Sequence, residues 1–230
     1  MGLTNKIVIP VIFAVSLLVA TFMVGLELII FNESYFEWHY ESRAVTESTE
    51  MDLDDLMVVT VEMLDYLKGD RATLDMTAMI SGEVQEVFGE KEKAHMVDVR
   101  DLYLGARNFK RMAMVIIIVV LLVGWIRSKS LLYEVLNRVR YIVPGLLLIV
   151  GIIGGLFATD FNKYFTIFHK IFFSNDLWML NPKTDILINM VPESYFFSIV
   201  MIGISIFALL IIMAIVLATY GAKKLRDQLA

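Results

Sequence analysis

Four long apolar runs constrain this chain more than any other feature. They occupy residues 7–31, 112–126, 141–159 and 195–219, and polar segments separate them. A bilayer core about 30 Å thick is crossed by about 20 apolar residues in a helix. The mean hydropathy of +0.69 is higher than that of an ordinary soluble domain. The sequence therefore predicts an all-α membrane protein with four transmembrane helices.

The ends of the runs set the predicted boundaries. The first run is too long for a secretory signal peptide, so we interpret it as a retained helix. The second run is short, but flanking Lys and Arg side chains can extend it by reaching toward the headgroups. In chain order we expect a transmembrane helix at 7–31, an extracytoplasmic cap at 32–109, a helix at 110–127, a cytoplasmic connector at 128–140, a helix at 141–159, an extracytoplasmic aromatic loop at 160–194, a helix at 195–219 and a cytoplasmic tail at 220–230.

Charge is segregated along the chain in a way that predicts its orientation. Short loops rich in Lys and Arg remain on the cytoplasmic side of a membrane. The connector and the tail are short and basic, through Arg127, Lys129, Arg138, Arg140, Lys223, Lys224 and Arg226. We therefore expect both termini in the cytoplasm, with the cap and the aromatic loop together on the outer side.

The cap is the largest polar segment, and its pattern predicts helices. Residues 52–68 place apolar side chains on one helical stripe, and Gly69 follows as a stop. A second helix is expected to begin near Glu90 and to continue into the second apolar run. These features predict a small helical cap.

Aromatic side chains crowd the loop at 160–194 around one histidine, His169. Trp and Tyr concentrate at the interface between membrane and water. The loop is too polar to be buried in lipid, so we interpret it as a shelf at the membrane surface. Because histidine takes and gives protons near neutral pH, His169 is a candidate general acid or base.

His95, on the predicted cap helix, is the second candidate catalytic residue. Asp98 follows it by one helical turn and can orient the imidazole, and Arg100 lies close in sequence. In the aromatic loop, Asn175, Asp176, Trp178 and Asp185 are candidates for supporting His169 or binding substrate. The simpler interpretation, that these side chains only satisfy local structure, remains open for each of them.

Several other classes of site find little support. The chain has no cysteine, which excludes thiolate nucleophiles and disulfides. There is no HExxH motif or close histidine pair for a metal, and no phosphate-binding or dinucleotide fingerprint, so no metal or cofactor is expected. No basic patch suggests nucleic acid. Ser174 lacks the nucleophile-elbow context of a serine hydrolase, and the span centres lack the charges typical of a transporter.

Two strings of residues carry a resemblance to a known family. The pattern FTIFHKIFF-SNDLW, continued by TDILINMVPESYF and preceded upstream by EKEKAHMVDVRDL, is similar to an integral membrane family of low-GC Gram-positive bacteria. Its characterised members are lipoprotein intramolecular transacylases. The similarity covers essentially the whole chain, including the four spans, the cap and both histidine strings.

The resemblance implies an acyltransferase of the cell membrane. It implies that the sn-2 acyl chain of a diacylglyceryl-cysteine lipoprotein moves to the α-amino group of the same cysteine, giving the lyso form. His95 and His169 then correspond to the family's catalytic pair, and the partners are a diacylated bacterial lipoprotein and membrane lipids. Two other functions remain open: a non-enzymatic binding or regulatory protein at the membrane surface, and a serine acyl hydrolase that depends on Ser174.

Overall fold

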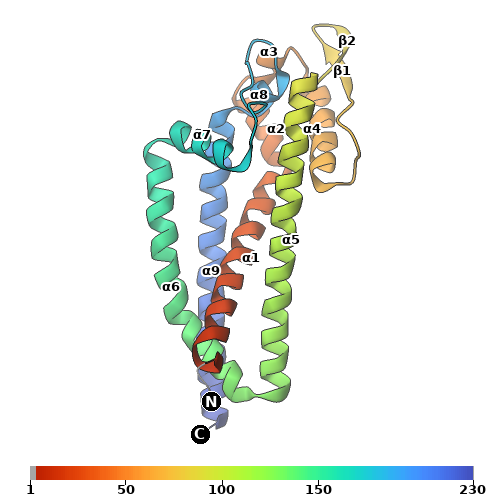
Figure 1. Cartoon of the computed structure of the whole chain (residues 1–230). Coiled ribbons are helices and arrows are strands. Elements are labelled where there is room, and N and C mark those ends of the chain that lie inside the picture. The colour runs from red at the N-terminus through yellow and green to blue at the C-terminus, as the bar shows by residue number, and fades with distance from the viewer. Residues whose placement is uncertain (1–3, 230) are drawn as a thin grey trace. The chain divides into compact units, whose positions relative to one another are not determined.

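The computed structural model describes residues 4–229, apart from the side chains at 4, 5, 153 and 156–158. Helices dominate the chain (Figure 1). The elements are η1 (Thr4–Val8), α1 (Ile9–Ile30), α2 (Glu33–Ser42), α3 (Val45–Thr49), α4 (Leu53–Lys68), β1 (Thr77–Ile80), β2 (Glu83–Glu86), α5 (Glu90–Arg127), α6 (Lys129–Thr159), α7 (Phe161–Phe172), α8 (Ile186–Met190) and α9 (Glu193–Leu229).

Within the described residues, four helices are long and apolar enough to cross a membrane. They are α1 with its η1 extension, α5, α6 and α9, so the prediction of four spans is confirmed. The helices extend beyond the apolar runs: residues 129–140 are helical and continuous with the third run, and α9 includes residues 220–229. Pro144 lies inside α6.

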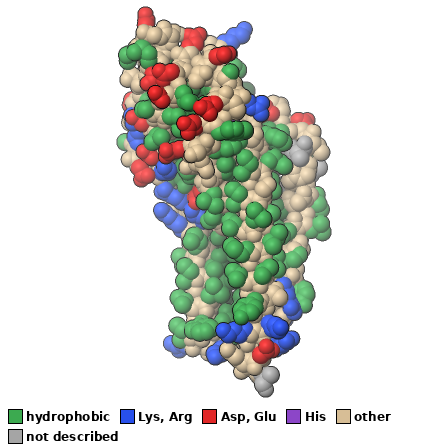
Figure 2. All heavy atoms as spheres, turned by 180° about the vertical axis from the view of Figure 1, so that it is seen from behind, with side chains coloured by type: hydrophobic (Ala, Val, Ile, Leu, Met, Phe, Trp, Pro, Cys, Tyr) green, Lys and Arg blue, Asp and Glu red, His purple; other side chains and the backbone are tan. Residues whose placement is uncertain are grey.

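The chain forms two compact units. Unit 1 comprises residues 1–27, 107–160 and 203–230, and unit 2 comprises residues 28–106 and 161–202. The core of unit 1 is apolar and includes the fully buried Val135, Val139 and Val143 of α6. Outward-facing apolar side chains cover the middle of its helices, and Lys and Arg side chains lie at both ends of this apolar band (Figure 2). This distribution suits helices surrounded by lipid.

Two glycines bring α1 and α9 together in unit 1. A Cβ atom on Gly25 would lie 3.1 Å from the backbone oxygen of Gly203 and 3.2 Å from the backbone nitrogen of Phe207. Small residues permit such close helix packing in membranes. Nearby, Glu27 of α1 forms an ion pair with Lys110 of α5, and both side chains are largely buried. The lone carboxylate of the first apolar run therefore has a partner on a neighbouring helix.

The predicted helix at 52–68 is present as α4, with both ends capped. The Asp52 side chain accepts a hydrogen bond from the backbone N–H of Asp55 at 2.9 Å. Gly69 ends the helix with a φ of +88°, a conformation that glycine adopts without strain. The buried face includes Leu56, Met63 and Leu64, as the stripe predicts. These residues belong to the apolar core of unit 2.

The cap is not helical throughout, which corrects the prediction. β1 and β2 form an antiparallel hairpin that pairs Ile80 with Glu83. The turn uses Ser81 and Gly82, both with positive φ, which matches the twist of a two-residue hairpin. Ala78 and Ile80 point into the core, whereas the alternate residues of the strand, Thr77 and Met79, are exposed. This two-residue alternation in a very short segment was overlooked beside the stronger helical patterns.

Candidate active site

His169 lies on the buried side of α7, near the helix end. The helix is strongly amphipathic, because phenylalanines recur at helical spacing in its sequence. Only 8% of His169 is exposed. The Phe165 ring meets the imidazole edge-on at a centroid distance of 4.4 Å, and the Trp178 ring covers it at 4.8 Å with a 30° tilt. The predicted aromatic shelf therefore encloses this histidine on several sides.

His95 comes from the other half of unit 2, on the first turns of α5, and is 7% exposed. Its ring centroid lies 6.2 Å from that of His169. Phe173 contacts both rings, at 5.4 Å from His95 and 5.5 Å from His169. The fold thus brings together two histidines that are 74 positions apart in the sequence. They form one site rather than two separate features.

The hydrogen bond of His169 determines its tautomer. Its Nδ1 atom lies 2.7 Å from the backbone oxygen of Phe165. A carbonyl only accepts hydrogen bonds, so Nδ1 carries the proton. Nε2 of the neutral ring consequently keeps its lone pair, which is the arrangement that a general base requires. In contrast, Nδ1 of His95 is buried and has no hydrogen-bond partner within the described residues.

Burial keeps both rings neutral. Desolvation, reinforced by the neighbouring His169, lowers the pKa of His95 to about 4. Desolvation also lowers the pKa of His169, although its hydrogen bond to Phe165 acts in the opposite direction. Asp98 is the negative charge that opposes the decrease at His95. At neutral pH the site therefore presents two uncharged imidazoles to a reactant.

We predict that His95 resists protonation until the pH approaches about 4. In the unfolded chain His95 binds a proton at about pH 6.5, whereas the folded chain does not bind it until about pH 4. Protonation therefore favours the unfolded chain, and the contribution of His95 to the free energy of unfolding, which is complete above pH 6.5, is lost as the pH falls toward about 4. The full effect is on the order of 3 kcal/mol, because one pKa unit corresponds to about 1.4 kcal/mol. NMR of ¹⁵N-histidine-labelled protein in micelles measures the titration, with assignment by a His95→Gln variant. A His95 resonance that titrates near pH 6.5 would contradict the prediction.

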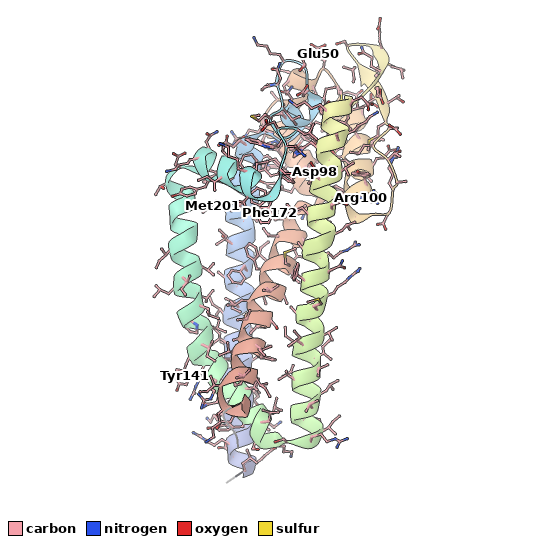
Figure 3. All side chains as sticks on the ribbon, in the orientation of Figure 1. Glu50, Asp98, Arg100, Tyr141, Phe172 and Met201 are labelled. Atoms are coloured by element: carbon pink, nitrogen blue, oxygen red, sulfur yellow. The ribbon has the colours of Figure 1, made fainter. Side chains whose placement is uncertain are left out.

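A pocket of about 220 Å³ adjoins the histidine pair. Asp98 of α5 and Phe172 of α7 both line it (Figure 3). Asn175, which follows α7, donates a hydrogen bond from Nδ2 to Oδ2 of Asp98 at 2.8 Å. Phe173 also lines the pocket, and it is the residue that touches both imidazoles. Two of the predicted supporting residues, Asp98 and Asn175, are therefore joined beside the histidines.

The remaining predicted residues have different surroundings. Trp178 packs on His169, and Asp176 is exposed. Asp185 accepts hydrogen bonds from the Asn181 backbone at 2.7 Å and from the Thr184 hydroxyl at 2.8 Å, so it shapes the loop before α8. Arg100 points away from Asp98 and lies 4.7 Å from the Tyr66 ring of α4 (Figure 3). The structure joins neither Asp185 nor Arg100 to the histidine pair.

Glu92 is a buried residue that the sequence reasoning missed. It is 3% exposed, and its two oxygens accept hydrogen bonds from the backbone N–H groups of Gly89 and Leu187, each at 2.7 Å. Desolvation raises the pKa of Glu92 despite these bonds. The hydrogen bond to Leu187, in the first turn of α8, fixes α8 and the loop that precedes it against α5. The signal in the sequence was its position one helical turn before His95.

No group of three or more His, Cys, Asp or Glu side chains within the described residues is arranged to hold a metal ion. The third histidine, His39, is 3% exposed and packs against Tyr195 at a centroid distance of 4.7 Å. Its ring therefore packs against the apolar core of unit 2, to which Tyr195 belongs.

Comparisons with known proteins agree with this architecture. The in meso structure of the membrane integral lipoprotein intramolecular transacylase Lit from Bacillus cereus has a similar fold, with a TM-score of 0.76 and 19% identity over 99% of this chain and 100% of that chain. Two variants of that protein, with one histidine changed to alanine or arginine, also match, with TM-scores of 0.72 and 0.73, 18% identity, and coverage of 96% of this chain and 94% and 93% of theirs. A search of curated proteins finds no significant match.

The sequence model of one protein family matches residues 11–196. The match includes most of the first predicted span, the next two spans, the cap, the aromatic loop, His95 and His169. Because it covers most of the chain, the chain belongs to the lipoprotein intramolecular transacylase Lit family, whose members are membrane acyltransferases.

Proposed function

We propose that this protein moves the sn-2 acyl chain of a diacylglyceryl-cysteine lipoprotein to the α-amino group of that cysteine, using His95 and His169 as the acid–base pair. The observation that carries the proposal is the pair of buried imidazoles, whose ring centroids lie 6.2 Å apart, together with Phe173, which touches both rings and lines a pocket. Both partners of the reaction belong to the substrate. The protein therefore needs to position them and to move a proton.

The proposed chemistry balances without an enzyme nucleophile. The neutral amine attacks the ester carbonyl, forming the C–N bond, and the attacking nitrogen becomes acidic as it does so. Nε2 of His169 accepts that proton. The C–O bond to glycerol then breaks, and the departing oxygen receives a proton from the histidine pair, leaving an amide and a free sn-2 hydroxyl. Well-oriented intramolecular reactions lower a barrier by up to about 7–11 kcal/mol, and acid–base help adds about 10²–10⁴ in rate.

Neutral histidines suit this reaction better than charged ones. An imidazolium cannot accept a proton, and the low pKa of His95 keeps that ring neutral throughout the physiological range. When a ring becomes charged during reaction, a nearby carboxylate stabilises it. Asp98 occupies that position, and its hydrogen bond from Asn175 fixes the carboxylate. We assign Asp98 the role of stabilising the histidine pair once it carries the proton, through the attraction of the carboxylate for positive charge at His95.

Changing Asp98 to asparagine is therefore predicted to lower kcat about tenfold, or about 1.4 kcal/mol, while KM changes less than twofold. An interaction made only in the transition state affects kcat and kcat/KM equally. The matched control is Asp101→Asn, which removes a charge from the same pocket without acting on His95. Kinetics with a synthetic diacylated lipopeptide measure both constants. A rise in KM alone would instead assign Asp98 to substrate binding.

We further propose that the histidine site faces the outer side and that both termini are cytoplasmic. The support is the distribution of charge in unit 1, where the 127–140 segment and the residues after 220 carry clustered Lys and Arg. Accessibility labelling of single cysteines introduced at Glu83 and Lys224 tests this orientation.

Mass spectrometry of a lipoprotein's N-terminal lipopeptide tests the function itself. Cells with the protein are compared with cells that lack it. An acyl group found on the cysteine amine only when the protein is present supports the transacylase. Loss of one acyl group to water would indicate a hydrolase, and an unchanged lipopeptide with confirmed expression would indicate a binding protein. The last two outcomes contradict the proposal.

A further inference from the structure

A second pocket, of about 160 Å³, lies between α6 and α9 in unit 1. It shares no lining residue with the pocket beside the histidines. One wall comes from α6 and the other from the last turns of α9. The lining side chains that can bind a ligand through polar atoms are Tyr133, Asn137, Arg140, Thr219, Lys223 and Arg226.

Helical spacing explains how the pocket is built. The three α6 residues are separated by four and three positions, and the α9 residues follow the same spacing, so each wall is one face of a helix. Gly221 lets the two helices approach: a Cβ atom at this position would lie 3.0 Å from Leu136 of α6. Ala222, which is buried, is the apolar residue in the lining. The pocket is therefore part of the helix packing in unit 1.

The charged side chains that line this pocket are all positive. Three of its lining residues are cationic, and among the described residues that line it none is acidic. Glu134 on the same helix is bound to Arg138 at 3.0 Å, and Asp227 is an exposed side chain 3.5 Å from Arg226. No ion pair within the described residues includes Arg140 or Lys223. Their positive charges consequently lack a protein counter-ion.

Arg140 carries the most specific signal. Its Nε atom is buried and has no hydrogen-bond partner within the described part of the chain. Its guanidinium lies 4.7 Å from the centroid of the Tyr141 ring, which orients it. A buried, unpaired guanidinium N–H is costly unless a ligand accepts its hydrogen bond. The planar guanidinium group of arginine can donate two parallel hydrogen bonds to the oxygens of a phosphate group.

We propose that this pocket binds the phosphate group of an anionic phospholipid. Arg140, Lys223 and Arg226 supply the charge, while Tyr133 and Asn137 supply neutral hydrogen-bond donors. Exposed apolar side chains flank it, including Leu217 and Tyr220 of α9, and offer a surface for the acyl chains. Basic pockets between transmembrane helices are established binding sites for acidic headgroups. The adjacent apolar surface favours a lipid over a free anion.

The test measures lipid retention by the full-length, delipidated protein in a neutral detergent. Native mass spectrometry compares phosphatidylglycerol with phosphatidylcholine of the same acyl chains, and inorganic phosphate is added as a competitor. The pocket variant is Arg140→Gln with Lys223→Gln. The matched control, Arg138→Gln with Lys224→Gln, removes the same charge from the same two helices but from residues that do not line the pocket.

The native protein is expected to retain phosphatidylglycerol at least tenfold more strongly than phosphatidylcholine. The pocket variant should lose most of this preference, and the control should keep it within twofold. An equal loss in both variants would show a general effect of charge and would overturn the site. Competition by millimolar inorganic phosphate would show a free-anion site and overturn the assignment to lipid. Exposed Lys223→Gln alone provides a variant expected to fold normally if the double change does not.

Discussion

Replacing His169 with alanine should lower the rate of acyl transfer by about 10²–10⁴, the range that acid–base catalysis contributes. The variant loses the Nε2 lone pair of His169, which is left ready to accept a proton because Nδ1 is committed to the Phe165 carbonyl. His95→Ala should show a loss of similar size. The measurement is single-turnover conversion of a diacylated lipopeptide, followed by mass spectrometry, with rates normalised to folded protein.

Two matched variants separate catalysis from folding in this experiment. His39→Gln changes a histidine that is equally buried but packs against Tyr195 in the core of unit 2. Its activity per folded molecule should stay within a few fold of the native value. Ser174→Ala should also remain active, since the proposed reaction uses no enzyme nucleophile. A folded His169→Ala protein with normal activity, or an inactive Ser174→Ala protein, would refute the proposed chemistry.

The two histidines should act as one unit. When residues cooperate in a single step, removing the second adds little to the loss from the first. The double variant His95→Ala with His169→Ala is therefore expected to be about as slow as the slower single variant. Losses that multiply would instead indicate that the two rings serve independent steps.

Glu92→Ala should destabilise α8 and the loop that joins it to α7 by about 3 kcal/mol. The change leaves the backbone N–H groups of Gly89 and Leu187 buried without acceptors, and each hydrogen bond to a charged group contributes about 1.5–3 kcal/mol. Hydrogen exchange at residues 186–190 should accelerate by about 10². Activity should fall as well, because this loop carries Trp178 and Asn175 to the site.

Glu90→Ala is the matched control for this prediction. Glu90 lies on the same helix and is almost fully exposed, and its contact with Lys93 at 3.5 Å is a surface ion pair. Loss of the Glu90 side chain should leave hydrogen exchange in α8 and the preceding loop unchanged. Glu92→Gln should give an intermediate effect, since its amide oxygen can still accept from one backbone N–H, whereas its NH₂ group cannot accept from the other. Unchanged exchange in Glu92→Ala would mean that other contacts hold the loop.

The membrane class and the helices followed from local sequence patterns. Apolar runs of sufficient length have one stable solution in a bilayer, because every backbone polar group must be satisfied within the segment. The same reasoning placed α4 between Asp52 and Gly69, whose capping chemistry is encoded within a few residues. The hairpin at 77–86 was missed because its alternating pattern spans only a few residues.

Tertiary structure decided how the candidate site is assembled. The sequence presented His95 and His169 as separate candidates, and only folding showed that Phe173 contacts both rings and that burial keeps both neutral. The fold also joins Asp98 to Asn175 beside the histidine pair, whereas Arg100 packs against Tyr66. Local patterns determine secondary structure and lipid exposure, whereas proximity and desolvation depend on contacts between distant residues, which no local pattern encodes.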